Sequence, residues 1–125
     1  NAKSQWFASG GYEPVAEKMF SLTDVDGFFL EYDDERSGGF EPLRFVPKGD
    51  KIVVLGLVTT KFNVIESKDE LKRRVEEASK YVDIDQLALS PQCGFSSNAV
   101  GNLITVEDQM SKLQLVMETS QEIWG

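Results

Sequence analysis

The one cysteine of this sequence, Cys93, stands in the run Pro91-Gln92-Cys93-Gly94, directly after a short apolar segment. That segment, 86–90, has the composition of a buried β-strand. In parallel α/β sheets, the loops after the strands carry binding and catalytic groups more often than other parts of the chain. Gly94 allows a sharp backbone turn beside the sulfur. A lone cysteine is often only a small buried apolar side chain, but this position favours a chemical role for the thiol.

A second group of polar residues closes another apolar segment, 28–32, which also predicts a strand. Such a group contains candidates to orient a neighbouring ligand, although a solvated acidic loop explains it about as well. Paired carboxylates would also suit a glycosidase, but nothing in their spacing selects two acids that face a sugar. The group is Glu31, Asp33, Asp34, Glu35 and Arg36.

Alternating strands and helices must position these groups, in the pattern of βα units. The second of three predicted strands is rich in Ile and Val, which is typical of a strand covered on both faces. We find no internal repeat and no linker, so residues 1–125 are expected to form a single unit. The predicted strands are 28–32, 51–58 and 86–90, with irregular turns at 40–46 and a polar loop at 95–103.

Three helices are predicted from their start signals and their apolar spacing. Pro14 suits the first turn of the first helix, and Ser67 with Glu70 has the capping-box pattern. Thr105 is the expected N-cap of the last helix. The residues expected to face the core are Val15, Ala16, Met19 and Phe20, then Leu71, Val75, Ala78 and Val82, and finally Met110, Leu113, Met117 and Trp124.

Composition limits the classes of function. The chain has 125 residues, a net charge of -8, one cysteine and no histidine. The negative charge argues against a nucleic-acid partner, and no apolar stretch approaches the roughly 20 residues that span a bilayer. A single cysteine cannot form an internal disulfide, which favours a cytoplasmic location. Without histidine, a Ser-His-Asp triad around Ser96 is excluded within this chain.

The cysteine turn and the acidic strand end resemble the cobalamin-independent methionine synthase family, in particular its shorter members that lack the N-terminal domain. The matching segments are 26–38, 56–61, the pair Glu66-Ser67, 87–97 and 116–124, so the resemblance extends over nearly the whole chain. It implies that the chain is the C-terminal segment, about the last three βα units, of a (β/α)₈ barrel with parallel strands. Asn1 and Ala2 are interpreted as a cloning remnant.

The resemblance implies that Glu31 and Cys93 are zinc ligands. The family completes the site with a His-x-Cys pair, which by its order in the family would come upstream of residue 1. It implies a zinc-dependent methyl transfer from a methyltetrahydrofolate-type donor to homocysteine, giving methionine. A catalytic zinc site needs three protein ligands and one open position. With two ligands of its own, the isolated chain is expected to bind zinc weakly or not at all, and to be inactive.

Two alternatives stay open. The chain could be a non-catalytic fragment, or an accessory half that acts only in association with the rest of a barrel. It could also belong to a relative that alkylates a different thiol, such as coenzyme M, or that uses a methyl donor other than the folate. In either case, three strands cut from a closed barrel leave unpaired sheet edges and an apolar face. The chain is therefore expected to form a homodimer or a higher oligomer.

Overall fold

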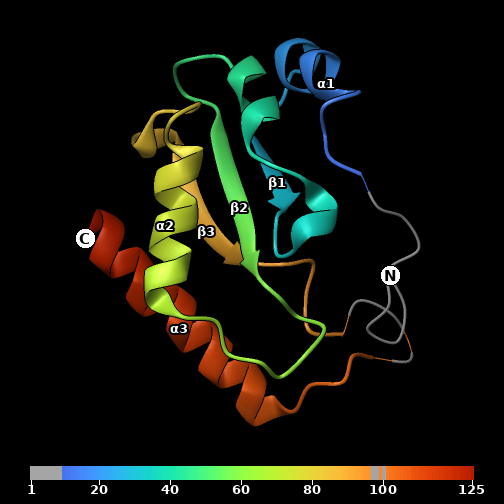
Figure 1. Cartoon of the computed structure of the whole chain (residues 1–125), viewed down its shortest axis with the longest axis vertical. Coiled ribbons are helices and arrows are strands. Elements are labelled where there is room, and N and C mark those ends of the chain that lie inside the picture. Colours follow the sequence, from blue (N-terminus) through green and yellow to red (C-terminus); the bar gives the residue numbers. More distant parts are fainter. Residues whose placement is uncertain (1–9, 97–98, 100) are drawn as a thin grey trace.

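The protein is an α/β unit with three strands and three α-helices (Figure 1). The computed structural model describes residues 10–96, 99 and 101–125. Asn1, Ala2 and three residues of the predicted 95–103 loop, Ser97, Asn98 and Val100, lie outside the described residues. The elements are α1 (Ala16–Leu22), β1 (Gly27–Glu31), η1 (Glu35–Ser37), η2 (Glu41–Phe45), β2 (Ile52–Val58), α2 (Lys68–Ala78), η3 (Ile84–Gln86), β3 (Leu87–Pro91) and α3 (Val106–Trp124), where η denotes a 3₁₀ helix.

The three strands form one parallel sheet in the order β1-β2-β3. Leu55 in the central strand pairs with Leu30 on one side and Leu89 on the other. Each strand lies within about one residue of its predicted position, because the apolar runs and the turn residues that bound them are clear signals. Since all strands run the same way, their carboxyl ends meet at one edge of the sheet, and this edge carries both sequence-predicted site residues.

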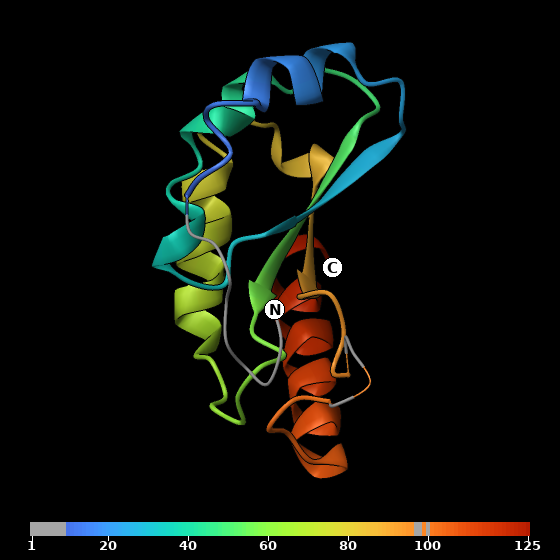
Figure 2. The ribbon, with the colours of Figure 1, turned by 90° about the vertical axis from the view of Figure 1, so that its right-hand side faces the viewer.

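One face of the sheet is covered and the other is open. In β1 and β3, buried side chains alternate with more exposed ones; Phe29 of β1 is 82% exposed, and Ile52 at the start of β2 is 37% exposed. Figure 2 shows α2, η1 and η2 on one side of the sheet. The expectation that β2 is covered on both faces is confirmed over 55–58, where consecutive residues are buried, whereas Ile52 is exposed and Val54 is partly exposed. The buried strand residues are Phe28, Leu30, Val53, Leu55, Leu57, Val58, Leu87 and Leu89.

Side-chain caps define the start of the two longer helices, as predicted. The Ser67 hydroxyl accepts a hydrogen bond from the Glu70 N–H at 3.2 Å, whereas the Glu70 carboxylate pairs with Arg73 instead of completing the capping box. At the start of α3, Thr105 and Asp108 form a complete capping box. The predicted core residues Leu71, Val75, Ala78 and Val82 are all buried.

The predicted core face of α3 is wrong. Met110 and Met117 are 63% and 62% exposed, and Leu113 is also exposed. The buried residues of α3 are Lys112, Leu115 and Thr119, while Trp124 is partly buried against the core. The helix thus has two stripes at helical spacing, and the buried one contains a lysine, which sequence rules place outside. Its burial is possible because Lys112 binds Glu66 at 2.9 Å.

In the described parts of the chain, no helix is long and apolar enough to cross a membrane.

Candidate functional site

A small pocket opens at the carboxyl edge of the sheet. Its volume is about 130 Å³, and both sequence-predicted ligands, Glu31 and Cys93, line it. Glu31 is the last residue of β1, and Cys93 follows the end of β3. The parallel register therefore brings together two residues that are far apart in the sequence. The other lining residues are Phe29, Leu30, Gly56, Ser90, Pro91 and Gln92.

The Glu31 carboxylate is held at one oxygen by two donors. Arg36 donates to Oε2 at 2.8 Å, and the Gln92 side-chain amide donates to the same oxygen at 3.3 Å. The backbone N–H of Glu31 donates to the Tyr12 hydroxyl at 3.0 Å, which fixes the strand end beneath the side chain. Since the Glu31 side chain is 32% exposed, its carboxylate is anchored and still reachable from the pocket.

The Cys93 thiol is exposed at the mouth of the pocket. The preceding Gln92 N–H donates to the Val58 carbonyl at 3.0 Å, so the turn is tied to the end of β2. Gly94 adopts φ 110°, a conformation that favours glycine and lets the chain turn away beside the sulfur. Desolvation by the surrounding groups, followed by a hydrogen bond with Glu31 and its negative charge, raises the pKa of Cys93. The metal-free thiol is therefore protonated at neutral pH.

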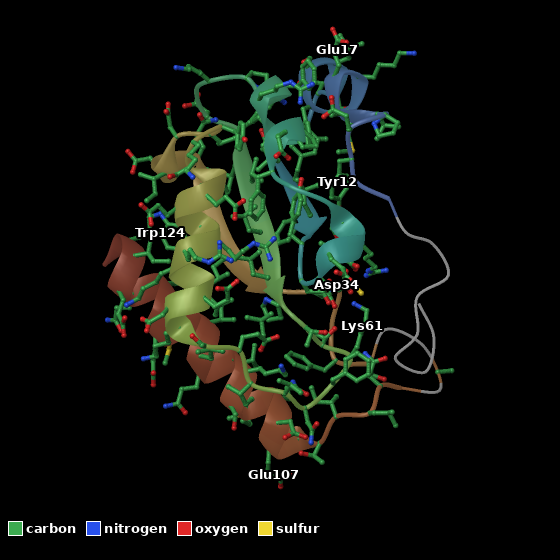
Figure 3. All side chains as sticks on the ribbon, in the orientation of Figure 1. Tyr12, Glu17, Asp34, Lys61, Glu107 and Trp124 are labelled. Atoms are coloured by element: carbon green, nitrogen blue, oxygen red, sulfur yellow. The ribbon has the colours of Figure 1, made fainter. Side chains whose placement is uncertain are left out.

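A buried ion pair lies behind the pocket. Lys61 follows β2, and its ammonium lies 3.2 Å from Oδ2 of Asp33, with both side chains at most 5% exposed. The same ammonium donates to Oε1 of Gln92. Figure 3 shows Lys61 and Asp34 at the same end of the sheet. The Arg36 guanidinium lies 3.2 Å from the Asp34 carboxylate and also pairs with the Glu31 carboxylate. The charged side chains at this edge therefore form a connected network.

The loop that carries Lys61 is fastened at several points. Asn102 donates from its side-chain amide to the Thr60 carbonyl at 3.0 Å. Glu66 accepts from the Thr59 N–H at 2.7 Å and from Lys112 of α3 at 2.9 Å. These bonds hold the loop in place and so position Lys61 behind the pocket.

The pocket brings together two side chains of kinds that zinc accepts as ligands. A thiol and a carboxylate are both donors that zinc accepts, and the two side chains already interact with each other. Among the residues that the structure describes, no group of three His, Cys, Asp or Glu side chains is arranged to hold a metal ion. The donors of this chain therefore fit zinc in kind but require ligands from elsewhere to complete its coordination.

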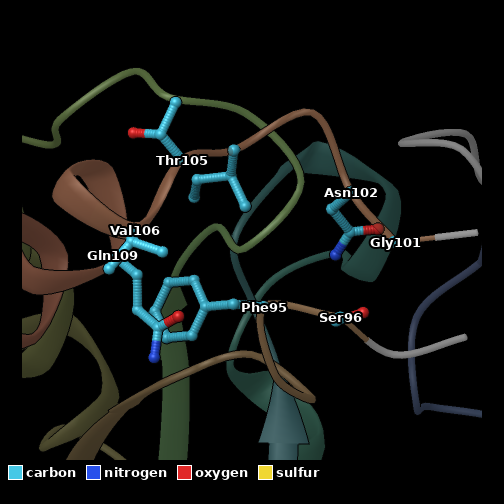
Figure 4. Close-up of a pocket in the computed structure, with 8 residues that line it drawn as sticks. Phe95, Ser96, Gly101, Asn102, Thr105, Val106 and Gln109 are labelled. Atoms are coloured by element: carbon cyan, nitrogen blue, oxygen red, sulfur yellow. The ribbon is translucent and has the colours of Figure 1, made fainter.

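A larger cavity of about 420 Å³ lies between the turn after β3 and the start of α3 (Figure 4). Its walls include Phe95, Asn102, Thr105 and Gln109, and none of the described residues that line it is charged. The described lining contains no cysteine, histidine or carboxylate side chain that could bind a metal ion. The smaller pocket is therefore the stronger candidate for a metal site.

Some residues of this site were predicted from the sequence, and others become evident only in the structure. Of the charged residues predicted directly after Glu31, at 33–36, Arg36 is the one that contacts its carboxylate. Lys61 and Gln92 were not identified as site residues, although both belong to loops after strands. Gln92 adjoins the cysteine, and this adjacency was the available signal for it. The link from Lys61 to Gln92 spans 31 positions, and no local pattern reveals it.

Comparison with known proteins identifies the family. The catalytic domain of cobalamin-independent synthase matches residues 13–116. The chain is 56% identical to the uncharacterised protein YxjG of Bacillus subtilis and 51% identical to its YxjH, over 99% of this chain in each case. It spans 33% of the length of either relative.

Two solved structures share the fold. A protein described as a vitamin-B12-independent methionine synthase from Listeria monocytogenes aligns with a TM-score of 0.71 and 43% identity, over 93% of this chain and 33% of that one. A B12-independent methionine synthase from Shewanella, solved with selenomethionine, aligns with a TM-score of 0.73 and 22% identity, over 90% and 30%. The expected fold, about a third of such a barrel, is confirmed, and the chain belongs to the cobalamin-independent methionine synthase family.

Proposed function

We propose that this chain is the zinc-holding part of a methyltransferase that transfers a methyl group from a methyltetrahydrofolate-type donor to homocysteine. The reaction is that of a 5-methyltetrahydropteroyltriglutamate-homocysteine S-methyltransferase. The observation that carries the proposal is the pairing of Glu31 and Cys93 in one pocket at the carboxyl edge of the sheet. Family membership supports it, since the match is to the catalytic domain.

In this proposal Glu31 and Cys93 bind zinc, and neither is the nucleophile. A zinc ion bound here would lower the pKa of a substrate thiol, so that the thiolate is available at neutral pH. Cys93 must lose its proton to become a ligand, and zinc binding therefore releases this proton. Arg36 and Gln92 hold the Glu31 carboxylate in place from behind. The remaining ligands come from a His-x-Cys pair outside this chain.

Zinc content of the full-length protein that carries these residues tests the proposal. Cys93→Ala should remove both the metal and methyl transfer to homocysteine. Glu31→Gln should weaken zinc binding, while Glu35→Gln, an exposed neighbour in η1, serves as the matched control. Stoichiometric zinc in the Cys93→Ala protein would contradict the proposed ligand. Near-normal methyl transfer without Cys93 would contradict the proposed mechanism.

The identity of the methyl donor and of the acceptor thiol is part of the same proposal. Assays of the full-length protein with homocysteine, and separately with coenzyme M, distinguish the two acceptors. Methyltetrahydrofolate and its polyglutamate are the donors that we expect to work. The isolated 125-residue chain, with two of the required ligands, should bind little zinc and transfer no methyl group in the same assays.

We also propose that the isolated chain forms a homo-oligomer, supported by the open sheet face on which Phe29 is 82% exposed. Light scattering at micromolar concentration should give a mass above the 14.0 kDa of one chain, and Phe29→Glu should lower it. A monodisperse wild-type monomer would contradict this proposal. A cytoplasmic location of the full-length protein is proposed because a free thiol such as Cys93 persists in a reducing compartment.

A further inference from the structure

Gln92 lies between a cation and an anion, and its two amide ends match them. Its oxygen accepts from the Lys61 ammonium, and its nitrogen donates to Glu31 at 3.3 Å. An ammonium group can only donate and a carboxylate can only accept. The two neighbours therefore allow a single orientation of the amide. Because Gln92 and Lys61 are both buried, water does not compete effectively for these bonds.

The bonds made by Gln92 and Arg36 converge on one oxygen of Glu31, Oε2. A carboxylate held at one oxygen by two donors presents its other oxygen with a fixed direction. This oxygen, Oε1, is the one left for a metal beside Cys93.

Lys61 is in turn held by the Asp33 carboxylate at 3.2 Å. Oδ1, the second oxygen of Asp33, accepts no hydrogen bond from any residue that the structure describes, and it lies 4.0 Å from the guanidinium of Arg36. Burying this ion pair costs free energy that a pair of apolar residues would avoid. This buried pair adjoins the candidate site and is connected to it through Gln92.

We propose that Lys61 and Gln92 are positioning residues for the metal ligand Glu31. Lys61 fixes the orientation of the Gln92 amide, and Gln92 fixes the Glu31 carboxylate so that Oε1 faces the Cys93 thiol. Lys61 acts on the metal site chiefly through Gln92, because its contact with Asp33 reaches Glu31 only across the 4.0 Å separation between Asp33 and Arg36. This inference rests on the proposed zinc site, and it adds two residues that do not touch the metal.

The test is the zinc affinity of the full-length protein, measured by competition with a chromogenic chelator. Groups that orient metal ligands contribute roughly 10- to 100-fold to affinity. Lys61→Met and Gln92→Leu should each weaken zinc binding by about that factor. The double variant should bind zinc little more weakly than Gln92→Leu alone, because the other route from Lys61 to Glu31, through Asp33 and Arg36, includes a separation of 4.0 Å.

Gln92→Glu separates positioning from folding. The change keeps the size of the side chain and retains a partner for Lys61, so the protein should fold. It replaces the donor that faces Glu31 by an acceptor, so zinc affinity should fall. A merely structural role of Gln92 would leave zinc affinity unchanged in this variant.

Two surface residues make similar contacts away from the site and provide matched controls. Gln114 donates its amide to Glu118 at 2.7 Å, and Lys68 pairs with the same carboxylate at 2.6 Å. Gln114→Leu and Lys68→Met should leave zinc affinity at the wild-type value.

Wild-type affinity in Gln92→Glu and Gln92→Leu, together with loss of zinc in Cys93→Ala, would overturn the positioning role alone. If Lys61→Met lowers zinc affinity by the same factor in the Gln92→Leu protein as in the wild type, the route through Gln92 would be overturned. Zinc retained in full by Cys93→Ala, or a wild-type protein that binds none, would overturn the proposed function and the positioning role with it.

Discussion

Among the residues that the structure describes, two lysines are buried, and their surroundings differ. Lys61 lies behind the pocket, on Asp33 and Gln92, and its contacts continue to Glu31. Lys112 lies in the middle of α3 and binds the Val64 carbonyl and Glu66.

The contacts of Lys112 end in the loop after β2, whereas those of Lys61 continue to Glu31 in the candidate site. Glu66, the partner of Lys112, uses its other oxygen to accept the Thr59 N–H at 2.7 Å, so both carboxylate oxygens serve the fold. Asp33, the partner of Lys61, has one oxygen that accepts no hydrogen bond from the described residues. Lys112 thus holds a loop of the fold in place, whereas Lys61 is placed to orient a side chain of the candidate site.

Lys112→Met should have the largest effect on stability. It leaves the Val64 carbonyl and the Glu66 carboxylate without their cation, and breaking a buried ion pair costs about 3 kcal/mol. Urea denaturation of the isolated chain measures the change in the free energy of unfolding. Lys68→Met, which breaks exposed pairs with Glu118 and Glu122, should cost less than about 1 kcal/mol. Equal losses in the two variants would remove the distinction between a buried and an exposed lysine.

A second, smaller effect is expected from Glu66→Gln. The Gln side chain can still accept the Thr59 N–H, but its amide nitrogen would face the Lys112 ammonium. Losing one hydrogen bond to a charged group should cost about 2 kcal/mol. Zinc affinity of the full-length protein should stay at the wild-type value, since the variant keeps the bond from Thr59 that fastens the loop of Lys61. A large drop in zinc affinity would show that both lysines serve the site.

The parts of the fold that could be predicted are those encoded by neighbouring residues. The strands could be predicted from apolar runs between turn residues. The start of α3 could be predicted from Thr105 because its capping partner, Asp108, is three positions away. The positions of Glu31 and Cys93 at one edge follow from parallel strands alone.

The missed features depend on pairs that are distant in the sequence. Lys112 could enter the core because Glu66, 46 positions away, meets it there. With that face buried, the stripe of Met110, Leu113 and Met117 faces outward. Gln92 likewise gains its role only when Lys61 and Glu31 meet it from two other strand ends. A sequence pattern cannot show which buried charge will find a partner.

The smallest effect concerns the thiol itself and tests whether Glu31 is held against Cys93. Burial comes first among the causes that raise the pKa of Cys93, and the hydrogen bond and charge of Glu31 come next. Glu31→Gln removes the charge and leaves the burial, so the pKa of Cys93 should fall toward its ordinary value. At a pH below this pKa, a lower pKa means more thiolate and therefore faster alkylation by iodoacetamide.

Because the chain has one cysteine, mass spectrometry of the metal-free isolated chain reports on Cys93 alone. Glu35→Gln should leave the rate unchanged, since Glu35 is not among the groups that act on the thiol. An unchanged or slower reaction in Glu31→Gln would mean that the charge of Glu31 does not act on the sulfur, which would count against the proposed metal site.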